Sequence, residues 1–318
     1  MNTQNPINLL KKQILMRRVV IATIPCIAAS VYFFGWRSLV VILVSCAAAF
    51  TTEFFFTRRR KEQVSEAVFV SAIIYALIMP PTVPWHVLII GIVFAIIFSK
   101  EVFGGFGRNI FNPAMAGRAF VYVSFPVALT ARWAPTASGA WGALGRWTTA
   151  VPDAITSATP MALVKAGSAP PPLVNLLIGN VSGTMGVTSV IAILIGGLYL
   201  FATKTASRYI IITVIIVYAA MTGLFSVLRV PGVAGILPAL FGGGFLFGAF
   251  FMATDPISAP KNKQAQVAYA ALIAIATAVI RTFSVFNGGF MFSLLFANMF
   301  ASILDHVFKR RAQQRQSA

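Results

Sequence analysis

The chain alternates between long apolar stretches and short polar connections, a pattern typical of a polytopic membrane protein. A helix needs about 20 apolar residues to cross a bilayer. We predict ten such spans, at 19–35, 38–56, 66–81, 84–99, 109–129, 187–203, 208–228, 232–253, 266–284 and 289–308. Glycine and proline interrupt several of them, so we predict broken helices near Pro80-Pro81, Gly104–Gly107 and Pro231–Gly244.

Five spans on each side of a long connection suggest two structural halves. Because five is an odd number, similar halves would be inverted relative to each other. We therefore predict an all-α integral membrane protein with a first five-helix repeat, an extracytoplasmic loop, a second five-helix repeat and a basic cytoplasmic tail, at 1–129, 130–186, 187–308 and 309–318. Gly104–Pro113 and Gly242–Pro256 give weak internal support, although a chance glycine-rich helix could produce the same pattern.

Composition and charge agree with a membrane protein. Only 10% of the 318 residues are charged, against about 25% in soluble domains. The net charge of +18 could suggest nucleic-acid binding, but the basic residues form short clusters between apolar stretches, as topology signals do. We predict no nucleic-acid partner, cytoplasmic termini, and Val19–Tyr32 as a first span rather than a removable signal.

The segment Phe106–Phe120 is unusually polar for its position between apolar stretches. It contains two arginines, two asparagines, a proline and two glycines. Lipid offers such groups no hydrogen-bond partner, so they face protein, water or a ligand. A binding site is one interpretation; the other is a loop whose glycines and arginines only anchor it at the headgroups.

The long connection carries a second candidate. It is rich in small residues, with Trp133, Trp141 and Trp147 suited to a membrane interface, and contains Asp-Ala-Ile-Thr-Ser-Ala-Thr-Pro at Asp153–Pro160. Taken alone, this motif is ordinary turn material. The two cysteines and two histidines are scattered, so we predict no metal site, and no catalytic residue is evident.

Several segments occur together in an order that resembles the NqrB/RnfD family, the membrane flavin subunits of ion-pumping redox complexes. They are Val64–Trp85, Lys100–Phe120, Asp153–Pro160, Ala253–Pro256 and Phe286–Asn298. The resemblance runs from about Leu10 to Phe308. The compact N-terminus is more similar to RnfD than to NqrB, which usually carries a longer extension.

The resemblance implies a covalent cofactor. In this family the last threonine of a Ser-Gly-Ala-Thr-like motif carries FMN through a phosphoester bond. The matching positions are Thr156, Ser157, Ala158 and Thr159, preceded by Asp153, so Thr159 is the expected acceptor. Ser157 and Ala154 replace the usual glycines. A separate flavin transferase would attach the FMN, so the chain needs no catalytic base there.

The family also holds a non-covalent riboflavin, and the matching residues are Asn109 and Asn112. An amide both donates and accepts hydrogen bonds, as the edge of a flavin ring requires. The alternative is that both side chains cap helix breaks. Arg108 and Arg118 could contact a flavin or anchor the broken helix. Glu53, Glu101 and Asp255 lie near predicted helix ends, where capping is expected.

By resemblance, we expect the D subunit of an Rnf-type complex, which passes electrons between ferredoxin and NAD while moving Na⁺ or H⁺. Its partners would be the other membrane and peripheral subunits, a flavin transferase and the lipid bilayer. One alternative is the B-type subunit of a Na⁺-translocating NADH:quinone reductase. From a different class, a solute channel or transporter can share the inverted-repeat fold.

Overall fold

The computed structural model describes residues 10–130, 133–137, 139–148, 159–233, 235–284, 286 and 288–317. The first half contains β1 (Leu10–Lys11), α1 (Ile14–Phe34), α2 (Arg37–Arg60), β2 (Val64–Ser65), α3 (Ala67–Leu77), α4 (Trp85–Ile96), the π-helix η1 (Ile97–Glu101), α5 (Pro113–Ser124) and α6 (Pro126–Thr130). The remainder contains α7 (Pro160–Lys165), α8 (Leu173–Ile178), α9 (Val190–Ala202), α10 (Arg208–Val227), α11 (Ile236–Phe241), α12 (Phe245–Phe247), the π-helix η2 (Gly248–Met252), α13 (Lys263–Phe283) and α14 (Gly289–Ser317).

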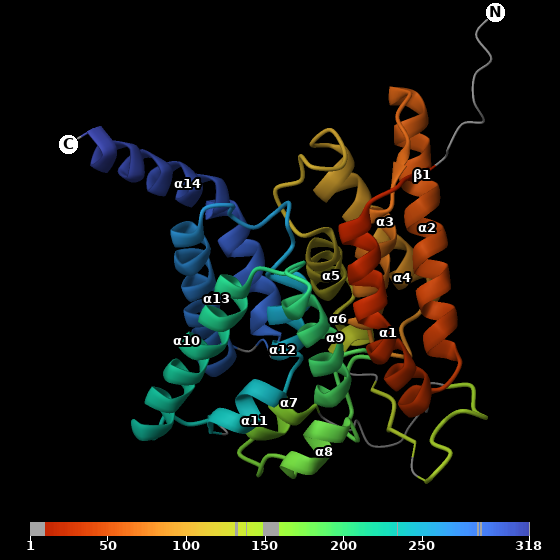
Figure 1. The fold of residues 1–318 in the computed structure, drawn as a ribbon. Helices are drawn as coiled ribbons and strands as arrows, with labels where there is room; N and C mark the ends of the chain where they lie inside the picture. The colour runs from red at the N-terminus through yellow and green to blue at the C-terminus, as the bar shows by residue number, and fades with distance from the viewer. Residues whose placement is uncertain are drawn as a thin grey trace, which may run out of the picture.

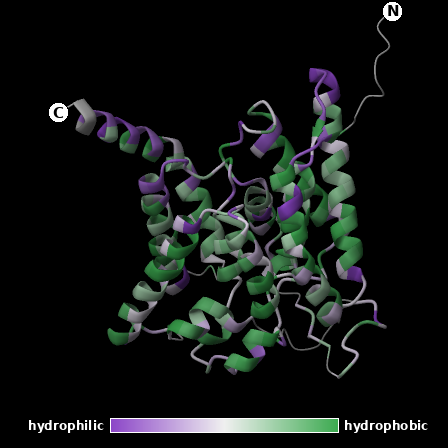
Figure 2. Ribbon diagram, in the orientation of Figure 1, coloured by the Kyte–Doolittle hydropathy of each residue, from purple (hydrophilic) through white to green (hydrophobic). Residues whose placement is uncertain are grey.

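The molecule is a multi-pass helical membrane protein, which confirms the predicted class. Among the described residues, five helices are long and apolar enough to cross a bilayer, namely α1, α2, α10, α13 and α14 up to residue 314. The helices α3 and α9 are shorter apolar helices. In Figure 2, apolar residues dominate the bundle from its middle to the end that carries α7, α8 and α11, and hydrophilic residues gather mainly at the other end. The division into two inverted repeats stays a prediction.

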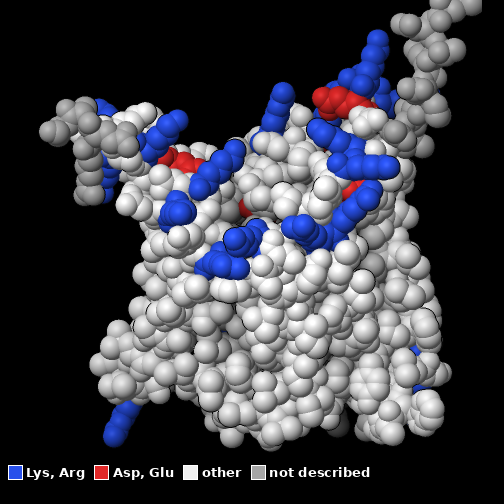
Figure 3. All heavy atoms as spheres, in the orientation of Figure 1, with Lys and Arg blue, Asp and Glu red and all other residues white. Residues whose placement is uncertain are grey.

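The two ends of the bundle differ in charge. In the view of Figure 3, most lysine, arginine and acidic side chains gather at one end, which we call the charged end. The pair β1–β2 and the C-terminal part of α14 lie at this end (Figure 1). The short helices α7, α8 and α11 lie at the opposite end, which we call the connector end (Figure 1).

The predicted breaks are present. α3 stops at Leu77, before the two prolines, and α11 and α12 are separated by Gly242–Gly244. Gly243 and Gly244 adopt φ angles of 61° and 68°, a left-handed conformation that glycine adopts without strain. The π-helix η1 ends at Glu101, and Gly104, Gly105 and Gly107 follow with positive φ angles. Glycine therefore turns the chain inside both halves.

One predicted span is divided in the structure, and one short element was not predicted. The span expected at 109–129 is instead α5 followed by α6. α5 begins at Pro113 because the Asn112 side chain accepts a capping hydrogen bond from the Met115 backbone nitrogen at 3.3 Å. Pro126 cannot continue α5 and opens α6. The two-residue parallel pair β1–β2 was not predicted, because strands this short leave no pattern.

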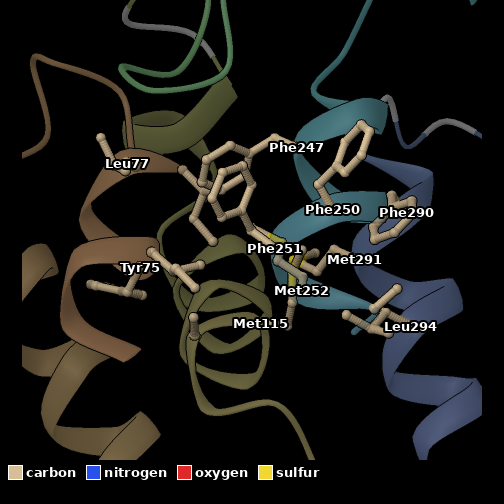
Figure 4. Close-up of a cluster of buried hydrophobic side chains, with 14 of the residues drawn as sticks. Tyr75, Leu77, Met115, Phe247, Phe250, Phe251, Met252, Phe290, Met291 and Leu294 are labelled. Atoms are coloured by element: carbon tan, nitrogen blue, oxygen red, sulfur yellow. The ribbon is translucent and has the colours of Figure 1, made fainter. Parts of the chain in front are cut away.

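Close helix contacts organise the bundle around small residues. A Cβ added to Gly117 on α5 would lie 2.7 Å from the Gly91 carbonyl oxygen of α4, so these backbones touch. α13 packs against both α10 and α14, and α1 packs against α9, α2 and α3. In the middle, α3, α5, η2 and α14 share one apolar cluster with Tyr75, Met115, Phe251, Met252 and Met291 (Figure 4).

Candidate functional site

A cavity of about 220 Å³ opens toward the connector end, and we call it the connector-end pocket. Thr159 and Arg118 both line it. The rest of its wall is largely apolar and aromatic, with a stretch of glycine backbone, and includes Ile78, Met115, Tyr122, Trp133, Met161, Gly242, Gly243, Gly244, Met252 and Phe290. An apolar pocket with a few polar groups is the usual form of a small-molecule or cofactor site.

Thr159 stands at the rim of this pocket as the N-cap residue of α7. Its φ and ψ angles of −64° and 154° are extended, and its carbonyl oxygen accepts the first helical hydrogen bonds, from Ala162 at 2.9 Å and Leu163 at 3.0 Å. The hydroxyl makes no capping hydrogen bond to the helix, so it is not needed to hold α7. The other predicted motif residues, Asp153, Thr156, Ser157 and Ala158, lie outside the described residues.

Two contacts fix α7 against the second half of the bundle. Met161 packs on the backbone of Gly242 in the pocket wall, because a Cβ added to Gly242 would lie 2.9 Å from the Met161 sulfur. The Lys165 ammonium donates hydrogen bonds to the carbonyl oxygens of Ser284 and Phe286. Burial lowers the pKa of Lys165, and the nearby Arg281 lowers it further. Thr159 is therefore held beside the pocket by residues close to it in the chain.

Arg118 faces the same pocket from α5. Its guanidinium donates to the carbonyl oxygen of Ile78, the C-cap residue of α3. This hydrogen bond satisfies a carbonyl group freed where α3 breaks, so Arg118 ties α5 to the end of α3, and a contact between Arg118 and a flavin stays a prediction. Its charge still lies in the wall of the connector-end pocket.

A second cavity, of about 60 Å³, lies nearer the charged end, and we call it the charged-end pocket. Asn109 and Asn112 line it together with Lys100, Phe106 and Asp255. The structure therefore separates the predicted flavin residues into two groups. Asn109 and Asn112 share one pocket, whereas Thr159 and Arg118 share the other.

Both asparagines are hydrogen-bonded to the protein. Asn109 donates to the Phe111 carbonyl oxygen at 3.3 Å. Asn112 caps α5 and also donates from its side chain to the Met252 carbonyl oxygen at 3.4 Å. The capping interpretation of Asn112 is thus confirmed, and a contact with riboflavin stays a prediction.

Two of the three acidic residues that the sequence analysis singled out depart from the expected capping role. Glu53 was expected to cap a helix, but it is buried and pairs with the Lys100 ammonium at 2.5 Å. Glu101 was also expected to cap, but it is buried and pairs with Arg60. Both corrections have the same cause, because η1 lies against α2 and brings opposite charges together. Asp255 does bind local groups, accepting from the Ile257 nitrogen at 3.2 Å and the Ser258 hydroxyl at 2.9 Å.

The two pockets lie back to back. α5 and η2 each contribute consecutive residues to the two walls: Ala114 and Phe251 face the charged-end pocket, and Met115 and Met252 the connector-end pocket. Ile74 of α3 lines the charged-end pocket, and Ile78, the C-cap residue of α3, lines the connector-end pocket. These two residues are four positions apart, which corresponds to a rise of about 6 Å along a helix. The partition is the central apolar cluster of Figure 4. A thin layer of side chains therefore separates the cavities.

Arg281, beside the connector-end pocket, is a residue whose place the sequence interpretation missed. The alternation of spans groups Arg281 with the few basic residues expected on the extracytoplasmic side. In the structure it is buried within α13 and only 5% exposed. The available signal was its position inside the predicted span 266–284, because charged residues inside spans are rare and usually functional.

The fold and the paired pockets define a polytopic membrane protein with cavities toward opposite ends. Residues 9–314 match the model of the NQR2, RnfD, RnfE family, and the chain belongs to this family.

Three relatives carry the name of the B subunit of Na(+)-translocating NADH-quinone reductase. The one from Ectopseudomonas mendocina (strain ymp) is 36% identical over 259 residues, and that from Haemophilus influenzae (strain PittEE) is 36% identical over 258. The one from Pseudomonas aeruginosa (strain LESB58) is 35% identical over 255 residues. Each match covers 77% of this chain and 60% of the relative.

Proposed function

We propose that this chain is the membrane flavin subunit of an ion-translocating oxidoreductase complex, with FMN bound covalently to Thr159. The observation that carries the proposal is the position of Thr159 at the connector-end pocket, with a hydroxyl that caps no helix. A threonine hydroxyl can be esterified by the flavin phosphate, and the bound flavin supplies one- and two-electron chemistry. The protein contributes the position, the apolar enclosure and the electrostatics.

The lining of the connector-end pocket suits a flavin ring. Trp133 and Tyr122 offer aromatic surface, and Gly242–Gly244 let a planar ring approach the backbone. Arg118 supplies a positive charge at the wall. Trp133 donates its indole N–H to the Thr130 carbonyl oxygen at 2.9 Å, so its orientation is fixed. The transferase remains a separate protein in this proposal.

The charged-end pocket is our candidate for the non-covalent riboflavin. Asn109 and Asn112 supply amides, and Phe106 supplies an aromatic face. Both pockets, at about 220 and 60 Å³, are below the usual 300–1,000 Å³ of ligand sites, so side chains must move aside to admit a flavin, and further in the charged-end pocket. The two flavins would then occupy neighbouring cavities on opposite sides of the apolar partition.

The names of the relatives favour a quinone reductase over the Rnf-type complex expected from the sequence. All three are B subunits of a Na⁺-translocating NADH:quinone reductase. We therefore propose a B-type role, with the ferredoxin:NAD type as the second candidate, and either Na⁺ or H⁺ as the ion moved. The other membrane and peripheral subunits would bind NADH or ferredoxin.

We further propose that the charged end faces the cytoplasm of a bacterial cell and the connector end faces outward. The gathering of lysine and arginine at one end supports this orientation, because positive residues are retained on the cytoplasmic side of the inner membrane. Thr159 would then lie on the extracytoplasmic side.

In-gel flavin fluorescence under denaturing conditions tests the covalent bond. The chain is produced together with an active flavin transferase as wild type, Thr159→Ala, Thr156→Ala and Ser157→Ala. We expect a fluorescent band in every form except Thr159→Ala. A dark wild-type band, with the transferase active on another substrate, would remove the covalent flavin and favour a solute channel or transporter.

A further inference from the structure

Arg281 is a buried cation that binds neutral oxygen atoms. It has no carboxylate partner within the part of the chain that the structure describes. Its Nη1 donates to the Tyr218 hydroxyl at 3.1 Å and to the carbonyl oxygens of Ala239 and Gly242 at 3.3 and 3.4 Å. Its Nη2 donates to the Gly243 carbonyl oxygen at 2.7 Å. These dipoles, and the rings of Tyr218 and Phe245 at 5.6 and 5.8 Å, stabilise the guanidinium but supply no negative counter-charge.

The guanidinium lies beside the wall of the connector-end pocket. Gly243 forms part of that wall. A Cβ added to Gly243 would lie 2.9 Å from Arg281 Nη2 and 2.9 Å from Met161 Cγ. Both atoms therefore lie on the side of Gly243 from which a side chain would project, and Arg281 stands next to the wall without being among the described lining residues. Met161, which lines the cavity, is two residues from Thr159.

The other charges at this wall are also positive. Arg118 lines the cavity from the opposite half of the molecule. Lys165 is fixed to the Ser284 and Phe286 carbonyl oxygens, just beyond the end of α13. The described lining of the pocket includes no aspartate or glutamate. Water screens charges weakly in such an interior, so the pocket favours an occupant that is negative or becomes negative.

We propose that Arg281 is a positioning residue that tunes the connector-end pocket for a reduced, anionic flavin ring, an inference that rests on the proposed function. It holds the carbonyl groups of Gly242 and Gly243 in place and sets a fixed positive charge beside them. A flavin ring that accepts two electrons and one proton gains one negative charge. The guanidinium stabilises that charge and so raises the midpoint potential of the flavin on Thr159.

The competing role for Arg281 is purely structural, as a cap for the C-terminal end of α11. The two roles predict different effects of replacing Arg281 with lysine or with glutamine. Arg281→Lys keeps the charge and some hydrogen bonds, whereas Arg281→Gln keeps hydrogen-bond donors and removes the charge. Charge tuning predicts that lysine preserves the potential and glutamine does not.

A matched control is available at the same end of the bundle. Arg37 also donates to backbone carbonyl oxygens, of Val83 at 2.9 Å and Thr148 at 3.3 Å. It is absent from the described lining of the connector-end pocket. Arg37→Gln therefore removes a carbonyl-binding arginine without removing charge from the pocket wall.

The test combines two measurements on the full chain produced with its flavin transferase. Denaturing-gel fluorescence reports attachment, and titration with dithionite and a reference dye reports the midpoint potential. We expect fluorescence in all forms. In Arg281→Gln the equilibrium constant for two-electron reduction should fall at least tenfold, a shift of about 30 mV to more negative potential. Arg281→Lys and Arg37→Gln should stay within threefold of wild type.

The outcomes separate the inference from the proposed function. A dark wild type overturns the proposed function and this inference with it. A fluorescent wild type whose potential is unchanged in Arg281→Gln overturns the inference alone, as does an equal shift in Arg281→Lys. Should Arg281→Gln fail to fold, Lys165→Met provides the second variant. It removes another cation of the same wall, and a potential at or above that of wild type would contradict charge tuning.

Discussion

The backbone nitrogen of Asn112 donates a hydrogen bond to the side-chain oxygen of Asn298 at 3.2 Å. This contact joins the start of α5 to the middle of α14, across 186 positions of the chain. The Asn298 amide nitrogen continues the network to the Tyr269 hydroxyl at 2.7 Å and the Ser258 carbonyl oxygen at 3.2 Å. The residue that caps α5 beside the charged-end pocket is thus held by the second half of the molecule.

Replacing Asn298 should destabilise the fold, because Asn298→Ala leaves several buried polar groups without their partner. Each such group costs roughly 1–3 kcal/mol. We expect a clearly lower melting temperature in detergent, measured as loss of monodisperse protein on size-exclusion chromatography after heating. Gln264→Ala, at an exposed position of α13, is the control and should melt like wild type. An unchanged Asn298→Ala would show that the network contributes little.

The buried Glu53–Lys100 pair predicts that a second substitution restores part of the stability lost in the first. Lys100→Met leaves the Glu53 carboxylate, 1% exposed, without its counter-charge, which costs about 3–5 kcal/mol. Adding Glu53→Gln removes the unpaired charge, so the double variant should be more stable than Lys100→Met alone. The comparison is made by thermal unfolding in detergent. A double variant less stable than Lys100→Met would contradict a simple ion pair.

The exposed Arg17–Glu66 pair serves as the reference for that experiment. Its atoms lie 2.6 Å apart, but the Arg17 side chain is 54% exposed. Solvent and salt screen such a pair. Arg17→Met should therefore change the melting temperature far less than Lys100→Met does.

Close contact between α4 and α5 predicts that Gly117 tolerates no side chain. The added methyl group of Gly117→Ala would lie 2.7 Å from the Gly91 carbonyl oxygen and 2.8 Å from the Ala95 Cβ. We expect a loss of about 1–3 kcal/mol from overpacking, seen as a lower melting temperature. Gly145→Ala, where a Cβ would meet no atom within 4 Å, should have little effect. Equal stability of both variants would contradict this close approach.

The sequence revealed those features that glycine, proline and apolar length encode locally. Pro80 and Gly242–Gly244 mark real helix breaks, whereas the long-range contacts left no local trace. Asn112 meets Asn298 only after folding, and Lys100, which looked like a topology signal, is buried against Glu53. The separation of Asn112 from Arg118 into two pockets likewise depends on how α3, α5 and η2 pack.

Peptide mapping by mass spectrometry tests the central claim most directly. Trypsin cleaves after Arg146 and Lys165, so one peptide, 147–165, contains Thr159 together with Thr156 and Ser157. For protein produced with an active flavin transferase, we predict that this peptide carries the mass of FMN less one water, and that fragmentation assigns it to Thr159. An unmodified peptide, or a flavin on Thr156 or Ser157, would contradict the account.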